Sequence, residues 1–160
     1  MCVTGFHHGA PLVDFRYRIG QMLNLRGEKL SEPQLEGCLR KALPAGRAYE
    51  HAVTEVLQTE PPRYRVYVEA VASDGGKWAV DAADAARRLD DALCDESAVY
   101  RTWRAKRAIG PCEVKPVAAG GFEALRAVRL SEGASPQQLK VSRVLRQEHH
   151  AAVLDTSRKP

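Results

Sequence analysis

Two pairs of adjacent histidines, His7-His8 and His149-His150, are the first candidates for chemistry in this 160-residue chain. Imidazole nitrogens are common ligands of transition metals. Adjacent side chains, however, point in different directions along a strand or a helix, so they seldom reach one ion together. No carboxylate or cysteine stands at ligand spacing to either pair. The sequence therefore predicts no metal site.

The cysteines are the next candidates, as nucleophiles or redox groups. They lack Cys-x-x-Cys spacing, and none has a nearby histidine and a third group to orient it; they are Cys2, Cys38, Cys94 and Cys112. The N-terminal stretch MCVTGFHHGAPLVDF has no charged segment followed by an apolar one, as a secretory signal would. We therefore expect free thiols in a reducing compartment, with a cytoplasmic location.

Charge and hydropathy bear on the class of partner. The net charge of +4 is mild and is spread along the chain. One basic cluster alternates with Tyr100 and Trp103, a loose likeness to a nucleic-acid stripe; its members are Arg101, Arg104, Lys106 and Arg107. A solvated helix face explains this cluster better, so we expect no nucleic-acid partner. Charges interrupt every apolar run before the roughly 20 residues needed for a membrane span.

The elements that must position these residues alternate between strands and helices. Apolar alternation predicts short strands at 3–6 and 12–17, then a small hairpin at 21–30 that turns at Gly27. Ser31 is expected to cap a helix that ends at 44–46, and the segments 51–57 and 64–71 to form an antiparallel pair.

The second half continues the alternation. Helices are expected at 81–93, from Asp95 or Ser97 to 108, at 122–128 and at 141–154, with a strand at 112–117. The expected fold class is α/β (α+β): a small mixed sheet flanked by helices, preceded by a two-stranded hairpin and a β stub.

The stretch RIGQMLNLRGEKLSEPQLEGCL, residues 18–39, resembles the hinge motif of adenylate-forming enzymes. In that motif an arginine closes the large domain, a hinge residue follows, and a hairpin with a glycine turn leads to an acidic helix. Arg18 matches the arginine, Gly20 and Gln21 fall at the hinge, and Gly27 matches the turn glycine.

Two further passages are similar to one branch, the Gretchen Hagen acyl-acid amido synthetases, and especially to its animal members. GPCEVKPVAAGGFEALRA, residues 110–127, resembles the family's Gly-Pro, strand, Gly-Phe and helix passage. Leu139-Lys140-Val141-Ser142-Arg143 resembles its terminal lysine motif, commonly Phe-Lys-x-Pro-Arg. The resemblance covers residues 3–154. It departs from the family where Gln21 replaces the usual hinge acid or lysine.

The resemblance implies an activity for a longer parent protein. A small carboxylic acid would be adenylated with ATP and magnesium, then conjugated to an amino acid. Residues 1–19 would be a stub of the large N-terminal adenylation domain, and residues 20–160 the mobile C-terminal domain. The family's phosphate loop and ribose-binding aspartate lie upstream of this chain, so we expect it to be inactive alone. The alternative is a non-catalytic interaction module from a member that has lost ligase activity.

The resemblance also implies roles for individual residues. Lys140 would offset negative charge at the α-phosphate during adenylation; otherwise it is an ordinary solvated lysine. The Gly27 hairpin would enter the active site for the amine step; otherwise Gly27 is a plain turn glycine. Lys29 either contacts the nucleotide or lies exposed. Arg143 either anchors the loop or pairs with a carboxylate.

Overall fold

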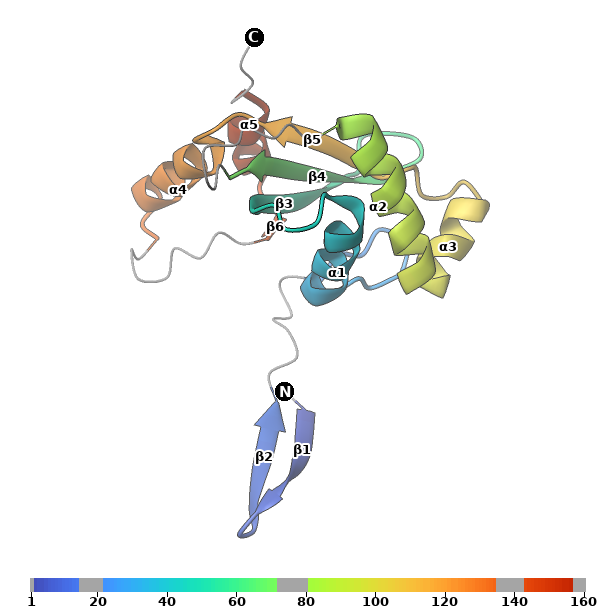
Figure 1. Ribbon diagram of the computed structural model, residues 1–160, viewed down its shortest axis with the longest axis vertical. Coiled ribbons are helices and arrows are strands. Elements are labelled where there is room, and N and C mark those ends of the chain that lie inside the picture. The colour runs from blue at the N-terminus through green and yellow to red at the C-terminus, as the bar shows by residue number, and fades with distance from the viewer. Residues whose placement is uncertain (1, 15–21, 72–80, 135–142, 157–160) are drawn as a thin grey trace.

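The computed structural model describes residues 2–14, 22–71, 81–134 and 143–156, and within them it has five helices and two β-sheets. Strands β1 (Cys2–His7) and β2 (Ala10–Asp14) form an antiparallel hairpin that stands apart from the other elements (Figure 1). The rest of the described chain surrounds a four-stranded sheet with the order β5-β4-β3-β6.

The centre of this sheet is the antiparallel pair predicted from the sequence. It consists of β3 (Tyr49–Val56) and β4 (Arg63–Ala70), with Val53 opposite Val66. Two parallel strands complete it: β5 (Glu113–Val117) beside β4, and β6 (Val144–Leu145) beside β3. Both faces are buried, because successive side chains of β3, β4 and β6 enter two different hydrophobic clusters.

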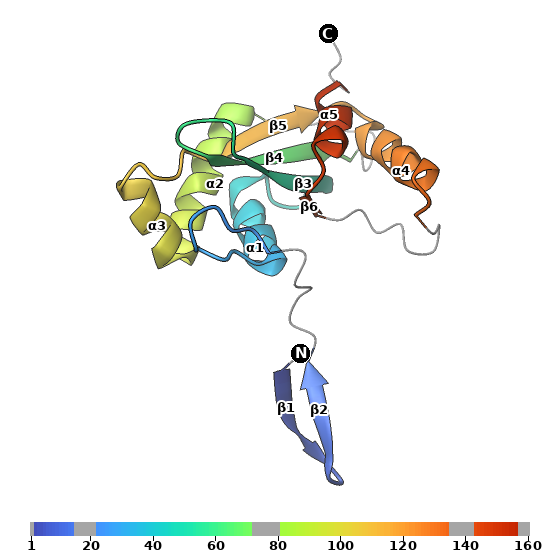
Figure 2. The same ribbon diagram turned by 180° about the vertical axis from the view of Figure 1, so that it is seen from behind.

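Helices cover both faces of the sheet (Figures 1 and 2). Helices α1 (Glu32–Ala42), α2 (Ala82–Glu96) and α3 (Ala98–Ala105) contribute to the cluster that contains Val53 and Val66. Helices α4 (Gly121–Ser131) and α5 (Glu148–Thr156) contribute to the cluster that contains Ala52 and Tyr67. None of the helices in the described ranges is long and apolar enough to cross a bilayer.

Local sequence signals explain where the first helices begin. Ser31 and Gln34 form a capping box at α1, and the Asp81 carboxylate accepts hydrogen bonds from the first turn of α2. Ser97 caps α3. The expected fold class is confirmed, as are the caps and the β3–β4 pair.

The final predicted helix is wrong in its first part. Val144 and Leu145 form strand β6 instead, and the helix begins at Glu148. Both side chains are buried, but in different clusters, as successive residues of a strand are. The Val53 amide donates to the Arg143 carbonyl, N–O 2.7 Å, which extends the pairing toward the N-terminal side of β6. The predicted hairpin at 21–30 is reduced to one antiparallel bridge between Leu23 and Leu30.

Candidate functional site

The hairpin tip carries two of the residues that the sequence selects. Leu23 and Leu30 exchange two backbone hydrogen bonds of 2.8 and 2.9 Å, and both side chains are buried. At the tip Gly27 has φ +97°, which L side chains rarely adopt, and no atom lies within 4 Å of where its Cβ would stand. Lys29 is exposed and has φ +50°. The tip therefore needs glycine for its backbone conformation and is open to solvent.

A buried carboxylate fixes the shape of this hairpin. Glu28 is 6% exposed, and its oxygens accept hydrogen bonds from the amides of Leu25 (2.7 Å) and Arg26 (2.8 Å) and from the Tyr64 hydroxyl. The Gly27 amide donates to Asn24 Oδ1, 2.7 Å away. Backbone donors that would otherwise face solvent thus converge on side chains of the hairpin itself.

Strand β3 holds the hairpin at the β6 edge of the sheet. Glu55 Oε1 accepts from the Asn24 amide (2.7 Å), and Glu55 Oε2 accepts from Arg146 Nη1 (2.9 Å). The same guanidinium also donates to the Met22 carbonyl. Residues near the start and the end of the chain therefore meet through one carboxylate.

Arg143 directly precedes β6, whereas Arg146 directly follows it. Arg143 Nη1 donates to the His51 carbonyl at 3.1 Å, and Arg143 Nε lies 4.0 Å from a Glu32 carboxylate oxygen in the first turn of α1. The first contact corresponds to the anchoring role and the second to the carboxylate pair, so both roles that the sequence leaves open are represented. The two contacts attach the chain next to β6 to both β3 and α1.

His51, whose carbonyl accepts the hydrogen bond from Arg143, is almost fully buried. Its Nε2 has no hydrogen-bond partner within the described residues. Burial, and secondarily the charge of Arg143, lowers the pKa of His51 to about 4, so the ring is neutral at physiological pH. The nearby Glu36 carboxylate opposes that shift.

The structure brings together only some of the predicted site residues. Gly27, Lys29 and Arg143 lie in the hairpin and at the adjoining β6 edge. Four others lie outside the described residues: Arg18, Gly20, Gln21 and Lys140.

Sequence reasoning missed the side chains that hold this site together: Asn24, Glu28, Glu55 and Arg146. Asn24 had a detectable signal, because an asparagine three residues before a turn glycine often accepts a backbone hydrogen bond. Glu55 and Arg146 had none, because they are 91 residues apart.

The basic cluster on α3 has a structural role in part. Arg104 pairs with Asp90, Nη2–Oδ2 2.8 Å, and Asp90 also accepts from the Tyr100 hydroxyl (2.7 Å) and the Cys112 amide (3.1 Å). Burial opposes ionisation of Asp90, but these hydrogen bonds hold its pKa below the ordinary value. Lys106 lies 5.2 Å from the centre of a Trp103 ring. Arg104 is thus directed into the protein rather than toward an external phosphate backbone.

The thiols with described side chains are unactivated. Cys38, Cys94 and Cys112 are free. Burial raises the pKa of Cys38 to about 11 and also raises the pKa of Cys94 and Cys112. These three cysteines are therefore not poised for nucleophilic chemistry.

Comparisons with known proteins agree on one family. The GH3 family C-terminal domain profile matches residues 45–149, more than half of the chain. A probable indole-3-acetic acid-amido synthetase, GH3.2 of Oryza sativa subsp. japonica, is 34% identical over 151 residues, which are 88% of this chain and 25% of that protein. A GH3 domain-containing protein of Mus musculus is 31% identical over 162 residues, covering 95% and 29%.

A solved structure supports the same assignment. The structure of the GH3.15 acyl acid amido synthetase superposes with a TM-score of 0.80 at 26% identity, covering 97% of this chain and 29% of that one. The chain thus spans about a quarter of the length of the relatives that it matches. The expected resemblance to the Gretchen Hagen family is confirmed. This chain belongs to the GH3 family and corresponds to its C-terminal domain.

Proposed function

We propose that this chain is the mobile C-terminal domain of an acyl-acid amido synthetase-like protein. The parent protein would adenylate a small carboxylic acid with ATP and magnesium and then conjugate it to an amino acid. Residues 1–19 would belong to the large N-terminal domain, and residues 20–160 would move relative to it about Gly20-Gln21, next to Arg18. The family membership supports the proposal, as do the relatives named for amido synthesis.

One structural observation carries the proposal: the Gly27 hairpin and the segment from Arg143 to Arg146 are held at the same sheet edge by Glu55 and Arg146. Lys140 precedes Arg143 by three residues, and three residues of extended chain span at most about 11 Å. We therefore propose that Lys140 and the hairpin belong to one working surface. Lys140 would offset negative charge on the phosphate in the adenylation step. The open Gly27 tip, with Lys29, would face the incoming amino acid in the amine step.

One candidate phosphate site among the described residues is already occupied. The glycine-rich start of α4 is the natural candidate, because free amides at a helix N-terminus bind phosphate. Here Glu69 already occupies it: its oxygens accept from the Gly120 amide (2.7 Å) and the Phe122 amide (2.9 Å). We infer that ATP is held mainly by the large domain, which is the partner this chain needs for catalysis.

The test compares this chain with a parent protein that carries both domains. The two-domain protein should bind ATP and release AMP only when both acid and amino acid are present. The 160-residue chain should show no ATP binding at micromolar concentrations in titration calorimetry. Tight ATP binding by this chain would overturn the assignment of the nucleotide to the large domain. A two-domain protein that binds no ATP would instead favour the non-catalytic interaction module.

A further inference from the structure

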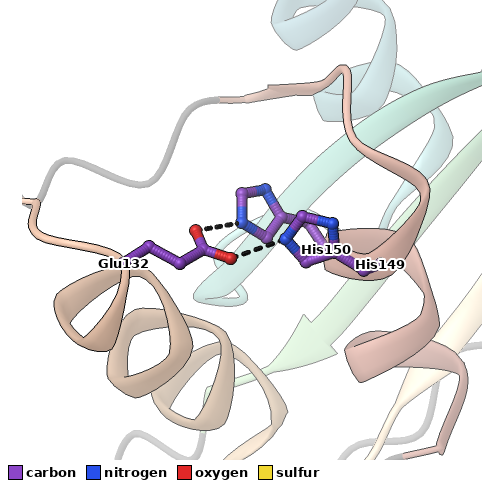
Figure 3. Close-up of side chains that lie close together, drawn as sticks. All are labelled: Glu132, His149 and His150. Atoms are coloured by element: carbon purple, nitrogen blue, oxygen red, sulfur yellow. Dashed lines mark hydrogen bonds and ion pairs between the residues drawn. The ribbon is translucent and has the colours of Figure 1, made fainter.

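Three potential metal ligands meet between α4 and α5. Glu132 directly follows α4, and His149 and His150 lie in the first turn of α5. Glu132 Oε1 is 2.6 Å from His149 Nε2, and Glu132 Oε2 is 2.8 Å from His150 Nε2 (Figure 3). The ligand atoms all lie within 4.8 Å of one another.

The expectation that adjacent histidines diverge does not hold for this pair. The centroids of the two rings are 4.3 Å apart, and both rings turn their Nε2 atoms toward the Glu132 carboxylate (Figure 3). Glu132 was not visible as a ligand in the sequence, because it lies 17 residues before His149. The fold supplies the missing carboxylate by bringing the end of α4 to the start of α5.

We propose that Glu132, His149 and His150 form a binding site for zinc or a chemically similar divalent transition-metal ion. Two imidazoles and one carboxylate are a donor set that zinc accepts, and three protein ligands leave a fourth position for water or another ligand. Magnesium and calcium are disfavoured, because they select oxygen ligands. Each histidine would bind through Nε2 and keep its proton on Nδ1.

Metal binding requires the three side chains to rearrange. Zinc–nitrogen and zinc–oxygen bonds of about 2.0–2.2 Å in a tetrahedral site separate neighbouring ligand atoms by about 3.3 Å. The nitrogen–oxygen distances of 2.6 and 2.8 Å are shorter, because they are hydrogen bonds. Rotation of the three side chains would have to lengthen these two contacts and bring all ligand atoms, which now lie within 4.8 Å of one another, to the common spacing around an ion.

Solvent can reach the site. The side chains of His149 and Glu132 are 57% and 39% exposed, while that of His150 is 11% exposed. Glu132 and His150 also border an open groove of about 450 Å³, whose lining includes Arg129 and Arg146. The groove gives room for a fourth ligand.

A bound ion would link the end of α4 to the start of α5. The residues between Glu132 and His149 include Lys140, to which we assign the charge-offsetting role. Resting on that proposed function, we infer that metal binding would also alter adenylation by the two-domain parent. The metal site itself is tested by binding, so its failure is separate from failure of the proposed function.

The test is a titration of the metal-free 160-residue chain with zinc, followed by calorimetry and by NMR of the histidine rings. We expect one equivalent to bind and to shift the ring signals of His149 and His150. The double variant His149→Ala/His150→Ala should lose at least about tenfold in affinity, and Glu132→Gln should also weaken binding. The matched control is His7→Ala/His8→Ala, because this pair is also adjacent, with rings 4.3 Å apart. This control variant should bind zinc with the affinity of the unmodified 160-residue chain.

Cobalt(II) distinguishes this site from binding by thiols. A site of two histidines and a carboxylate lacks the strong near-ultraviolet charge-transfer band of thiolate ligation. Circular dichroism of each variant checks that it is folded, and the ring shifts in the unmodified chain test the site without any substitution. Zinc affinity that survives removal of both His149 and His150, ring signals that do not move, or a thiolate band at one equivalent would each overturn the proposal.

Discussion

Arg146 and Glu55 are 91 residues apart in the sequence, yet their side chains are joined by a hydrogen-bonded ion pair of 2.9 Å. Glu55 is the more buried partner, at 16% side-chain exposure against 46% for Arg146. The same carboxylate accepts from the Asn24 amide, so one residue of β3 links the hairpin to the chain after β6. The hairpin to which we assign the amine step is thereby connected to Arg146, which follows Lys140 by six residues in the sequence.

The Glu55–Arg146 pair should show measurable coupling in a double-mutant cycle. We expect about 1 kcal/mol in the free energy of unfolding, because one partner is largely buried and the geometry is close. The exposed pair Arg87–Asp91, 3.8 Å apart, is the control and should couple by less than about 0.5 kcal/mol. Urea unfolding of the single and double alanine variants measures both. Equal coupling in the two pairs would contradict a special link between hairpin and sheet edge.

How far the sequence predicts this molecule depends on the range of the interactions involved. Helix α1 follows from short-range signals, the Ser31 cap and the spacing of Leu35 and Leu39, and it was predicted nearly to the residue. Strand β6 was not, because two apolar residues before a helix fit a helical period as well as a strand, and only pairing with Val53 decides between them.

The same limit applies to the candidate sites. Gly27 was identified from its local turn pattern and from the family resemblance, and its positive φ agrees with the turn. The contacts of Glu55 with Arg146 and of Glu132 with His149 depend on elements distant in the sequence. A single sequence contains no local pattern that encodes such pairs.

Glu28→Gln should destabilise the domain by about 2 kcal/mol. Two backbone amides and the Tyr64 hydroxyl donate to the two carboxylate oxygens. A carboxamide has one oxygen, so one buried donor would face an NH₂ group instead. Hydrogen exchange at the Leu25 and Arg26 amides should accelerate as well. Glu123→Gln, at a side chain that is 78% exposed, is the matched control and should change stability by less than about 0.5 kcal/mol.

Stability should fall with acidification through His51 before most carboxylates titrate. The folded pKa of about 4 lies below the unfolded value near 6.5, so the unfolded state binds the proton first. The stabilisation is therefore fully present above pH 6.5 and is lost as pH falls from 6.5 toward 4. The difference between the folded and unfolded pKa values, at 1.36 kcal/mol per pKa unit, limits this stabilisation to at most about 3 kcal/mol.

Chemical denaturation at several pH values between 7 and 4 measures this loss. His51→Leu removes the titrating group, so its stability should vary less across the same window, whatever its absolute stability. His7→Leu, at an exposed side chain of β1, is the comparison and should keep the pH slope of the unmodified chain. A His51 variant with the same pH slope as the unmodified chain would show that His51 does not govern it.

Substitutions at Lys140 and Gly27 should separate the two half-reactions in a parent protein that carries both domains. Lys140→Ala should slow acid-dependent exchange of pyrophosphate into ATP by roughly a hundredfold, about 3 kcal/mol, and should slow amide formation from a supplied acyl-adenylate much less. The reason is that new negative charge forms on phosphate in the first step only. Lys41→Ala, at an exposed lysine of α1, is the control and should change neither rate.

Gly27→Leu should show the reverse pattern, sparing exchange and blocking capture of the amine. The φ of +97° and the open space around Gly27 mean that leucine strains the tip and adds bulk where the acceptor side would close. Gly46→Leu is the matched control, because Gly46 also has a positive φ, +73°, and open surroundings, but lies after α1 and outside the hairpin. The Gly46→Leu variant introduces the same kind of backbone strain but adds no bulk at the hairpin tip. If Lys140→Ala and Gly27→Leu impaired both steps equally, or if Gly46→Leu matched Gly27→Leu, general destabilisation would explain the losses and the separate roles would be wrong.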